Sequence, residues 1–137
     1  MRPTTLINVF VDSNILIYLT DTDQYKKQIV EKIIVDRPLI NSQIAVEVAN
    51  VFRRKFGFTK FALLSLWQDM LNDYTIISTD SQSIQKAIQL VNRYDFQLFD
   101  ALIVADALTS DCTILYSEDM QHNILIENKL TIINPFL

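Results

Sequence analysis

Glycine, cysteine and histidine each occur only once in this chain of 137 residues, as Gly57, Cys112 and His122. A single glycine excludes the phosphate-cradling loops G-x-G-x-x-G and G-x-x-x-x-G-K, which need at least two. A single cysteine excludes an internal disulfide, and we expect Cys112 to be a small buried side chain in an intracellular protein. One histidine and one cysteine are too few for a zinc site.

Long hydrophobic runs and an excess of positive charge are also missing. Half of the residues are hydrophobic and the mean hydropathy is +0.18. The longest unbroken apolar runs are nevertheless about five residues, against the roughly 20 that span a bilayer. Because no signal peptide is visible either, we expect a cytoplasmic protein without a membrane segment. The net charge of −4 disfavours binding to nucleic acid through bulk charge, but it leaves room for a local basic patch or a metal site.

The length suits one domain over residues 1–137, in which strands and helices alternate. The apolar pattern predicts strands over residues 6–11, 38–41, 74–78, 113–116 and 130–133, and helices over residues 13–19, 22–35, 42–56, 59–72, 80–94 and 98–109. Ser42 is the expected N-cap of the third helix, and Gly57 its end. Strands that are apolar on both faces and alternate with helices indicate an α/β fold, with a parallel sheet covered on both sides.

Four carboxylates end or interrupt these apolar segments. Asp12 and Asp119 follow predicted strands, at the sheet edge where functional sites form in such folds. Glu47 lies on the shoulder of the apolar stripe of helix 42–56, and Asp100 opens a nearly all-apolar helical stretch. A carboxylate beside a core is costly unless a positive charge compensates it, so the four together suggest a shared cation.

Each carboxylate also has a simpler structural explanation when it is taken alone. Asp12 and Asp100 could be helix N-caps, Asp119 could be a turn residue, and Glu47 could pair with a basic neighbour. A shared site explains all four at once. Mg²⁺ and Mn²⁺ prefer oxygen ligands, and they can activate water against a phosphodiester.

Three motifs resemble the signatures of PIN domains, in particular those of VapC-type toxins of bacterial toxin–antitoxin pairs. They are VFVDSN at residues 9–14, FDALIVA at 99–105 and LYSEDMQH at 115–122, with Glu47 on a helix between the first two. Their order and spacing make the match specific, and the resemblance extends from Val9 to Phe136.

The resemblance implies a three-layer α/β/α fold with a central parallel sheet. It implies a ribonuclease that depends on Mg²⁺ or Mn²⁺, forms a homodimer and is inhibited by a small VapB-like antitoxin. The residues that it assigns to catalysis and metal binding are Asp12, Glu47, Asp100 and Asp119. It also implies that Asn14 and Ser117 orient these carboxylates or their waters.

Two positions depart from the pattern of these toxins. Asn123 replaces a glycine that commonly follows the histidine, although asparagine also tolerates a left-handed backbone. Asp106 replaces a small apolar residue, and we expect a residue that supports the site or lies on the surface. It could add a ligand or only a local charge.

The RNA-contact candidates are Arg53, Arg54 and Lys55, near the end of the helix that carries Glu47. The alternative is that these basic residues only stabilise the helix C-terminus.

Other functions stay open. A nuclease of the same fold could process RNA or cut DNA, and a catalytically silent PIN module could act only by binding. A complete set of four costly carboxylates argues against the silent module. A phospho-accepting receiver domain is also small, acidic and α/β, but the acceptor Asp and the Lys that it needs are missing at the ends of the expected strands.

Overall fold

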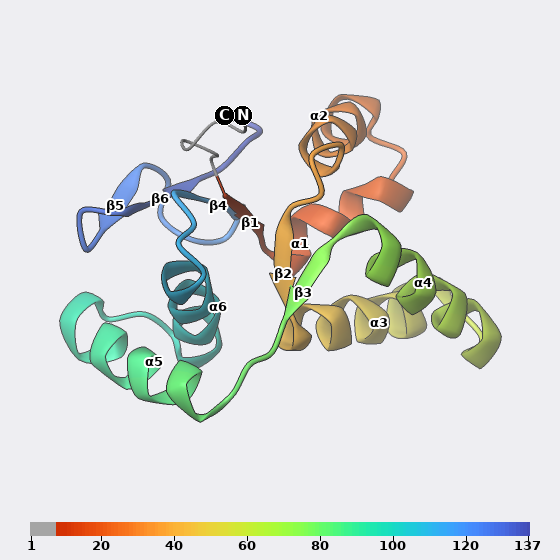
Figure 1. Ribbon diagram of the computed structural model, residues 1–137. Coiled ribbons are helices and arrows are strands. Elements are labelled where there is room, and N and C mark those ends of the chain that lie inside the picture. Colours follow the sequence, from red (N-terminus) through yellow and green to blue (C-terminus); the bar gives the residue numbers. More distant parts are fainter. Residues whose placement is uncertain (1–7) are drawn as a thin grey trace, which may run out of the picture.

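The computed structural model describes residues 8–137 (Figure 1). Its helices are α1 (Ser13–Leu16), α2 (Gln24–Ile34), α3 (Ser42–Phe56), α4 (Lys60–Asp73), α5 (Ser81–Tyr94) and α6 (Leu98–Thr109), with a short 3-10 helix η1 (Ile17–Thr20) after α1. Its strands are β1 (Val9–Val11), β2 (Leu39–Asn41), β3 (Thr75–Ile77), β4 (Ile114–Tyr116), β5 (Ile124–Ile126) and β6 (Leu130–Ile133). The first two residues of predicted strand 6–11 lie outside the described residues.

The strands form one sheet in the order β3-β2-β1-β4-β6-β5. All neighbouring pairs are parallel except β5 with β6, which is antiparallel. The predicted α/β fold with a central parallel sheet is therefore confirmed, except that the sheet also has an antiparallel edge strand, β5, which was not predicted. Val11 pairs with Tyr116, and Asn41 with Ile77, so the carboxyl ends of these strands line up along one edge.

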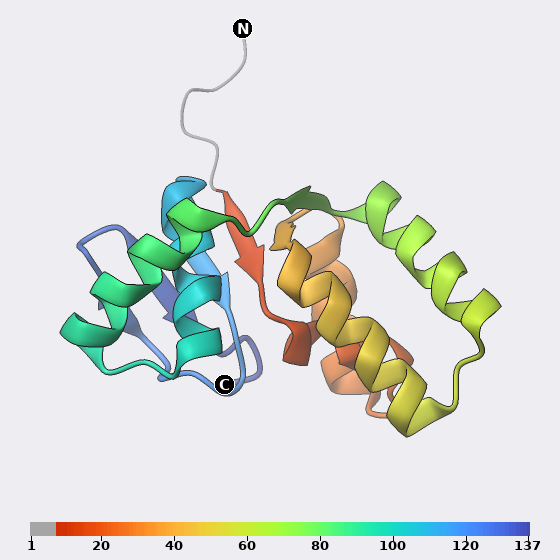
Figure 2. The ribbon, with the colours of Figure 1, turned by 90° about the horizontal axis from the view of Figure 1, so that it is seen from below.

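The central strands supply the middle of the hydrophobic core. Phe10, Ile40, Leu115 and Ile132 come from four strands and are fully buried in one cluster with residues of the helices. Figure 2 shows β1 running between two groups of helices, α5 and α6 on one side and α1 to α4 on the other. The carboxyl end of β1 therefore lies where the two groups meet.

Helix α3 begins one residue differently from the prediction. Its N-cap is Asn41, whose side chain accepts a hydrogen bond from the Ile44 N–H at 2.9 Å. The hydroxyl of Ser42 accepts from the Thr79 N–H instead, at 3.0 Å, and so ties α3 to the segment after β3. Gly57 ends the helix as predicted, with a φ of +65° that favours glycine.

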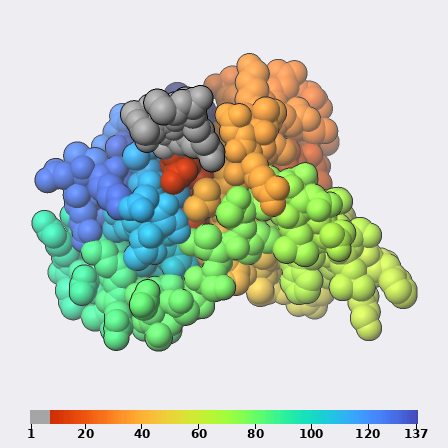
Figure 3. All heavy atoms as spheres, viewed as in Figure 1, coloured from red at the N-terminus to blue at the C-terminus, as the bar shows by residue number. Residues whose placement is uncertain are grey.

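The surface of the molecule is uneven. The turn between α3 and α4 stands out at one edge in the space-filling view (Figure 3).

None of the helices within residues 8–137 is long and apolar enough to cross a membrane. Cys112 is fully buried, as the sequence predicts.

Candidate active site

Asp12 lies at the carboxyl end of β1 and is only 4 % exposed. Its Oδ1 accepts from the backbone N–H of Ser13 at 2.7 Å and so caps α1, which confirms the helix-cap explanation. Its Oδ2 accepts from the Ser117 hydroxyl at 2.9 Å and from the Asn14 amide at 3.3 Å. The cap occupies one oxygen, so capping does not exclude a second role for this side chain.

Burial raises the pKa of Asp12 to about 6. Hydrogen bonds from Ser117 and Ser13 act in the opposite direction, and the charges of Asp100 and Glu47 add to the rise. The donors to Asp12 are all neutral groups. Its ionised form is therefore held at a free-energy cost that a nearby cation would relieve.

Glu47 faces Asp12 across Ser13. Its Oε2 accepts from the Ser13 hydroxyl at 2.8 Å, and the same hydroxyl lies 3.4 Å from Oδ1 of Asp12. Its Oε1 accepts from the side-chain amide of Gln43 at 2.8 Å. Both partners are neutral, so the expected alternative of a basic partner for Glu47 has no support among the described contacts. The sequence had not singled out Ser13, although this residue stands inside the VFVDSN motif.

Asp100 lies in the first turn of α6. The N-cap of that helix is Gln97, so the proposed cap role of Asp100 is wrong. Burial raises the pKa of Asp100, and the charges of Asp119 and Glu47 raise it further. Asp119 itself is exposed, in the loop after β4. The charges of Asp100 and Glu47 also raise the pKa of Asp12, so repulsion between charges links all four predicted carboxylates.

The four side chains are mutually repelling neighbours rather than a preformed cage. Within residues 8–137, no three acidic, histidine or cysteine side chains are arranged closely enough to hold a metal ion as they stand. Their donor atoms are all oxygens, which suits Mg²⁺ or Mn²⁺.

A hollow of about 570 Å³ adjoins these carboxylates between α3 and α6. Its lining consists of Ser42, Gln43, Val46, Glu47, Thr79, Phe99 and Leu102. Phe99, which is 69 % exposed, stands next to Asp100 in the chain and shares this hollow with Glu47. The Oε1 of Gln43 is buried without a hydrogen-bond partner among the described residues, so a donor from water or a ligand would satisfy it. Of the four carboxylates, only Glu47 lines this hollow, and the rest of its lining combines polar groups with the apolar side chains of Val46, Phe99 and Leu102.

The two supporting residues lie where the resemblance implies. Ser117 is fully buried and donates to Asp12. Asn14 donates to Asp12 and accepts from the backbone N–H of Glu118 at 3.1 Å, so it connects β1 to the loop that carries Asp119.

Asp106 is not a surface residue, as it is only 1 % exposed. It accepts from Asn41 and Thr79, both at 2.8 Å, and from the hydroxyl of Ser83. These contacts fasten α6 to the end of β2 and to the start of α5. Asp106 acts as a buried structural link, and its charge is not among those that act on Asp12 or Asp100, so the alternative that it adds a metal ligand has no support.

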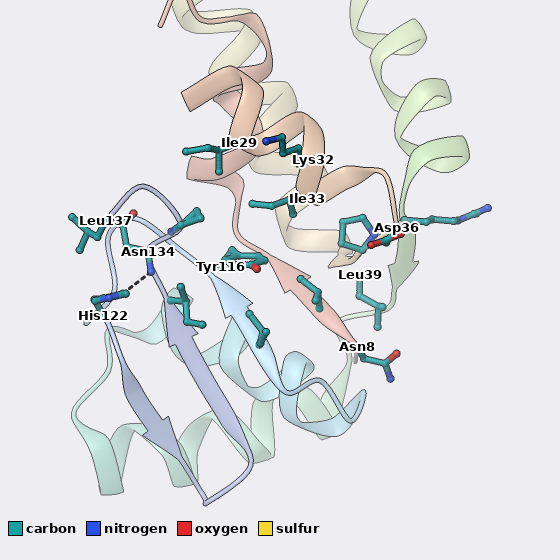
Figure 4. Close-up of a pocket in the computed structure, with 16 residues that line it drawn as sticks. Asn8, Ile29, Lys32, Ile33, Asp36, Leu39, Tyr116, His122, Asn134 and Leu137 are labelled. Atoms are coloured by element: carbon teal, nitrogen blue, oxygen red, sulfur yellow. Dashed lines mark hydrogen bonds between the residues drawn. The ribbon is translucent and has the colours of Figure 1, made fainter. Parts of the chain in front are cut away.

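A second pocket, of about 670 Å³, lies against the sheet between α2 and the C-terminal segment (Figure 4). None of the four carboxylates lines it. His122 does, and its Nδ1 accepts a hydrogen bond from the backbone N–H of Asn134 at 2.9 Å. This contact ties the ring to the chain after β6, so the structure supports a structural role for His122.

Arg53, Arg54 and Lys55 are exposed in the last turn of α3. The Nε of Arg54 donates to the backbone carbonyl of Asn50 at 3.4 Å. The three residues lie at the far end of the helix from the hollow, near the projecting turn of Figure 3. Contact with RNA stays a prediction for them, beside their favourable interaction with the helix C-terminus.

Known proteins share both the sequence pattern and the fold. The sequence matches the family model described as PIN domain over residues 9–124. One similar structure is a toxin–antitoxin complex from Klebsiella pneumoniae, with 21% identity, 93% of this chain and 98% of that chain covered, and a TM-score of 0.72. Another is VapC20 of Mycobacterium tuberculosis, a sarcin–ricin-loop-cleaving toxin, with 15% identity, 82% and 90% covered, and a TM-score of 0.66.

A third similar structure is FitAcB from Neisseria gonorrhoeae, with 12% identity, 93% and 98% covered, and a TM-score of 0.69. At these identities the structural likeness shows the fold alone. No curated protein sequence matches this chain.

Proposed function

This chain belongs to the PIN domain family, and from that membership and its carboxylates we propose that it is a metal-dependent endoribonuclease, the toxin of a type II toxin–antitoxin pair. The observation that carries the proposal is the environment of Asp12, which is buried among neutral donors and close enough to Asp100 and Glu47 to sense their charges. Such a carboxylate is poised to bind a cation.

The proposed chemistry assigns one role to each group of residues. When bound, Mg²⁺ or Mn²⁺ would supply an activated water and would offset the charge that develops on the phosphate. Asp12, Glu47, Asp100 and Asp119 would hold that ion. Ser117 and Asn14 fix the second oxygen of Asp12, and Ser13 fixes one oxygen of Glu47, so the ligands have little freedom to rotate.

RNA is proposed as the substrate in preference to DNA. VapC20, one of the similar structures, is a toxin that cleaves the sarcin–ricin loop. Such a toxin would act in the cytoplasm, where its RNA targets are. A role in RNA processing or on DNA is the alternative, and the substrate test below separates them.

The proposal includes a homodimer and a small VapB-like antitoxin. Two exposed apolar surfaces within residues 8–137 are candidates for these contacts. One lies on α5 and α6, around a groove of about 450 Å³, and includes Ile84, Ile88, Leu98 and Phe99. The other lies on α4 and includes Phe61, Leu64, Trp67 and Leu71. We assign the α5–α6 surface to the second copy, since two adjacent helices offer a broad face for an isologous contact.

The test is cleavage by the purified chain of single-stranded RNA and of DNA of the same sequence, with Mg²⁺, with Mn²⁺ and with excess chelator. We expect cleavage of RNA with either metal and no cleavage in chelator. Asp100→Asn and Asp12→Asn should abolish it and leave the circular dichroism unchanged. Asp73→Asn, a change at an exposed carboxylate at the end of α4, is the matched control and should keep full activity.

Undiminished cleavage in chelator, or in both active-site variants, would refute the shared-metal mechanism. Cleavage of the DNA at an equal or higher rate would favour the alternative substrate.

A further inference from the structure

The loop after β4 is fastened on both sides of Asp119. Ser117 before it and Met120 after it are both buried. Further along, His122 is hydrogen-bonded to the chain after β6. Asp119 itself is exposed, and the charge of Asp100 lies close enough to interact with it. Since the two carboxylates repel each other, the loop needs contacts that keep Asp119 beside Asp100 before a cation arrives.

Glu118 makes the strongest of these contacts. Its Oε1 accepts from the hydroxyl of Tyr18, and its Oε2 accepts from Nζ of Lys26 at 2.8 Å. Its backbone N–H donates to the side chain of Asn14. Three residues, from α1, η1 and α2, therefore hold the residue directly before Asp119. Lys26 compensates the charge of Glu118, whereas the hydrogen-bond donors to Asp12 and Glu47 are all neutral.

Lys26 lies in a partly enclosed place. Its Nζ stands 4.5 Å from the centre of the Tyr18 ring and 5.0 Å from that of Phe136. The two rings meet edge to face at 5.1 Å. The side chains of Lys26 and Glu118 are only 27% and 25% exposed. Because water is partly excluded, this ion pair is stronger than an open surface pair, and the aromatic faces stabilise the cation further.

Both partners stay charged near neutral pH. Hydrogen bonds to Glu118 and Tyr18 raise the pKa of Lys26 above its usual range. Burial alone would raise the pKa of Glu118, but hydrogen bonds from Lys26 and Tyr18 outweigh it and hold the pKa below its ordinary value.

We propose that Lys26 and Glu118 are positioning residues, which fix the loop after β4 so that Asp119 is held against Asp100 for metal binding. The part of this inference that concerns metal rests on the proposed function. The part that concerns the loop does not, because the contacts stand without a cation. Lys26 lies outside the three motifs that carry the family resemblance, and its Nζ is hydrogen-bonded to Glu118 and Tyr18, so it acts on the loop through Glu118.

A second ion pair provides a matched control. The Nζ of Lys86 in α5 lies 2.8 Å from Oε2 of Glu127, and the two side chains are 24% and 27% exposed. The pair therefore has the same length and nearly the same burial as Lys26 with Glu118. It connects α5 to the residue after β5 and touches none of the four carboxylates. Its removal measures what an ion pair of this kind contributes to stability alone.

The experiment compares Lys26→Met and Lys86→Met with the unchanged chain. Methionine keeps the length of lysine and packs well between aromatic rings, so Lys26→Met removes little besides the charge. Two quantities are measured: amide hydrogen exchange of residues 117–121 without metal, and Mn²⁺ affinity by calorimetry. Thermal unfolding reports the stability of each variant.

We expect Lys26→Met to speed exchange in this loop and to weaken Mn²⁺ binding about tenfold or more, the usual effect of losing a group that orients a ligand. Lys86→Met should lower the unfolding temperature to a similar extent. Its amide hydrogen exchange in residues 117–121 and its Mn²⁺ affinity should equal those of the unchanged chain. The charge-swapped double variant Lys26→Glu with Glu118→Lys should recover part of the affinity. Glu118→Gln is the milder variant to use if Lys26→Met fails to fold.

Unchanged loop exchange in Lys26→Met, or a change as large in Lys86→Met, would overturn the positioning role. So would an Mn²⁺ affinity that is equal in all three proteins. If the unchanged chain binds no Mn²⁺ and cleaves no RNA, the proposed function fails, and the exchange measurement still decides whether Lys26 and Glu118 hold the loop.

Discussion

Asp12→Asn is expected to stabilise the metal-free protein above pH 6, although it removes a proposed metal ligand. The pKa of Asp12 is raised from 3.8 to about 6 by burial. At about pH 3 and below, the carboxyl is largely protonated in both the folded and the unfolded chain, and the raised pKa has little effect. As the pH rises from about 4 to about 6, the unfolded chain loses its proton first, so the free energy of unfolding falls.

The size of the effect follows from the shift. A rise of about 2 pKa units corresponds to about 3 kcal/mol at pH 7 and above. Asparagine caps a helix as well as aspartate does, so the bond from the Ser13 N–H is kept. Its amide can also donate to the hydroxyl of Ser117. Subtracting about 1 kcal/mol for weaker hydrogen bonds leaves a net gain of about 2 kcal/mol, or several degrees in the unfolding temperature.

The assay is chemical unfolding in excess chelator between pH 4 and pH 8. The curves of Asp12→Asn and the unchanged chain should meet near pH 4 and separate by about 2 kcal/mol above pH 7. The control is Asp106→Asn, because Asp106 is equally buried but its three side-chain hydrogen bonds are 2.8 Å or shorter, against 2.9 and 3.3 Å for the bonds from Ser117 and Asn14 to Asp12. This control should lose about 2 kcal/mol.

An Asp12→Asn variant that is less stable than the unchanged chain at pH 8 in chelator would refute the reasoning, since it would mean that the Asp12 charge is already compensated. Addition of Mn²⁺ should reverse the order. The unchanged chain gains about 2.7 kcal/mol at a metal concentration of 100 times Kd, and the variant gains less.

Three further predictions concern parts of the molecule outside the carboxylates. Burial, with a smaller contribution from Asp111, raises the pKa of Cys112 to about 12. This thiol should therefore not react with an alkylating reagent at pH 8 until the protein unfolds, and rapid labelling of the native chain would contradict this. Gly57→Ala should lower the free energy of unfolding by about 1 kcal/mol, because φ is positive while no atom lies within 4 Å of the added Cβ, and a much larger loss would point to a clash. Ile88→Lys on the α5–α6 surface should turn a dimer into a monomer in sedimentation analysis; an unchanged mass would exclude this surface as the dimer contact.

The elements that the sequence predicts well are those with long apolar patterns. Helix 98–109 and strand 130–133 have the observed bounds, since apolar residues fill them and Pro135 follows the strand. The edge strand Ile124–Ile126 could not be identified, because three residues of which the middle one is exposed give no distinct period.

The interior of α6 shows a deeper limit of sequence patterns. A helix that is apolar on nearly all sides has no face that marks where a polar residue points. The burial of Asp106 depends on Asn41, Thr79 and Ser83, which come from other elements. Only the tertiary structure brings these donors together.

The same reasoning explains why the candidate ligands could be identified from the sequence and their supporting contacts could not. A carboxylate stands out when its neighbours in the chain are apolar, as those of Asp12 and Asp100 are. Lys26 and Glu118 look like ordinary surface residues, and nothing in the chain indicates that they meet across 92 positions.

Proton binding to Asp12 and metal binding to the site are thermodynamically linked, because burial of the Asp12 charge favours the protonated form. A cation binds the ionised carboxylate, so whatever holds the proton on Asp12 competes with the metal. Mn²⁺ affinity should therefore change little above pH 7 and fall up to tenfold per pH unit below about pH 6, where Asp12 takes up its proton. Calorimetry at pH 5, 6, 7 and 8 measures this. An affinity that is flat down to pH 5 would mean that Asp12 is not a ligand, and it would contradict the proposed site even if the stability of Asp12→Asn followed the expected curve.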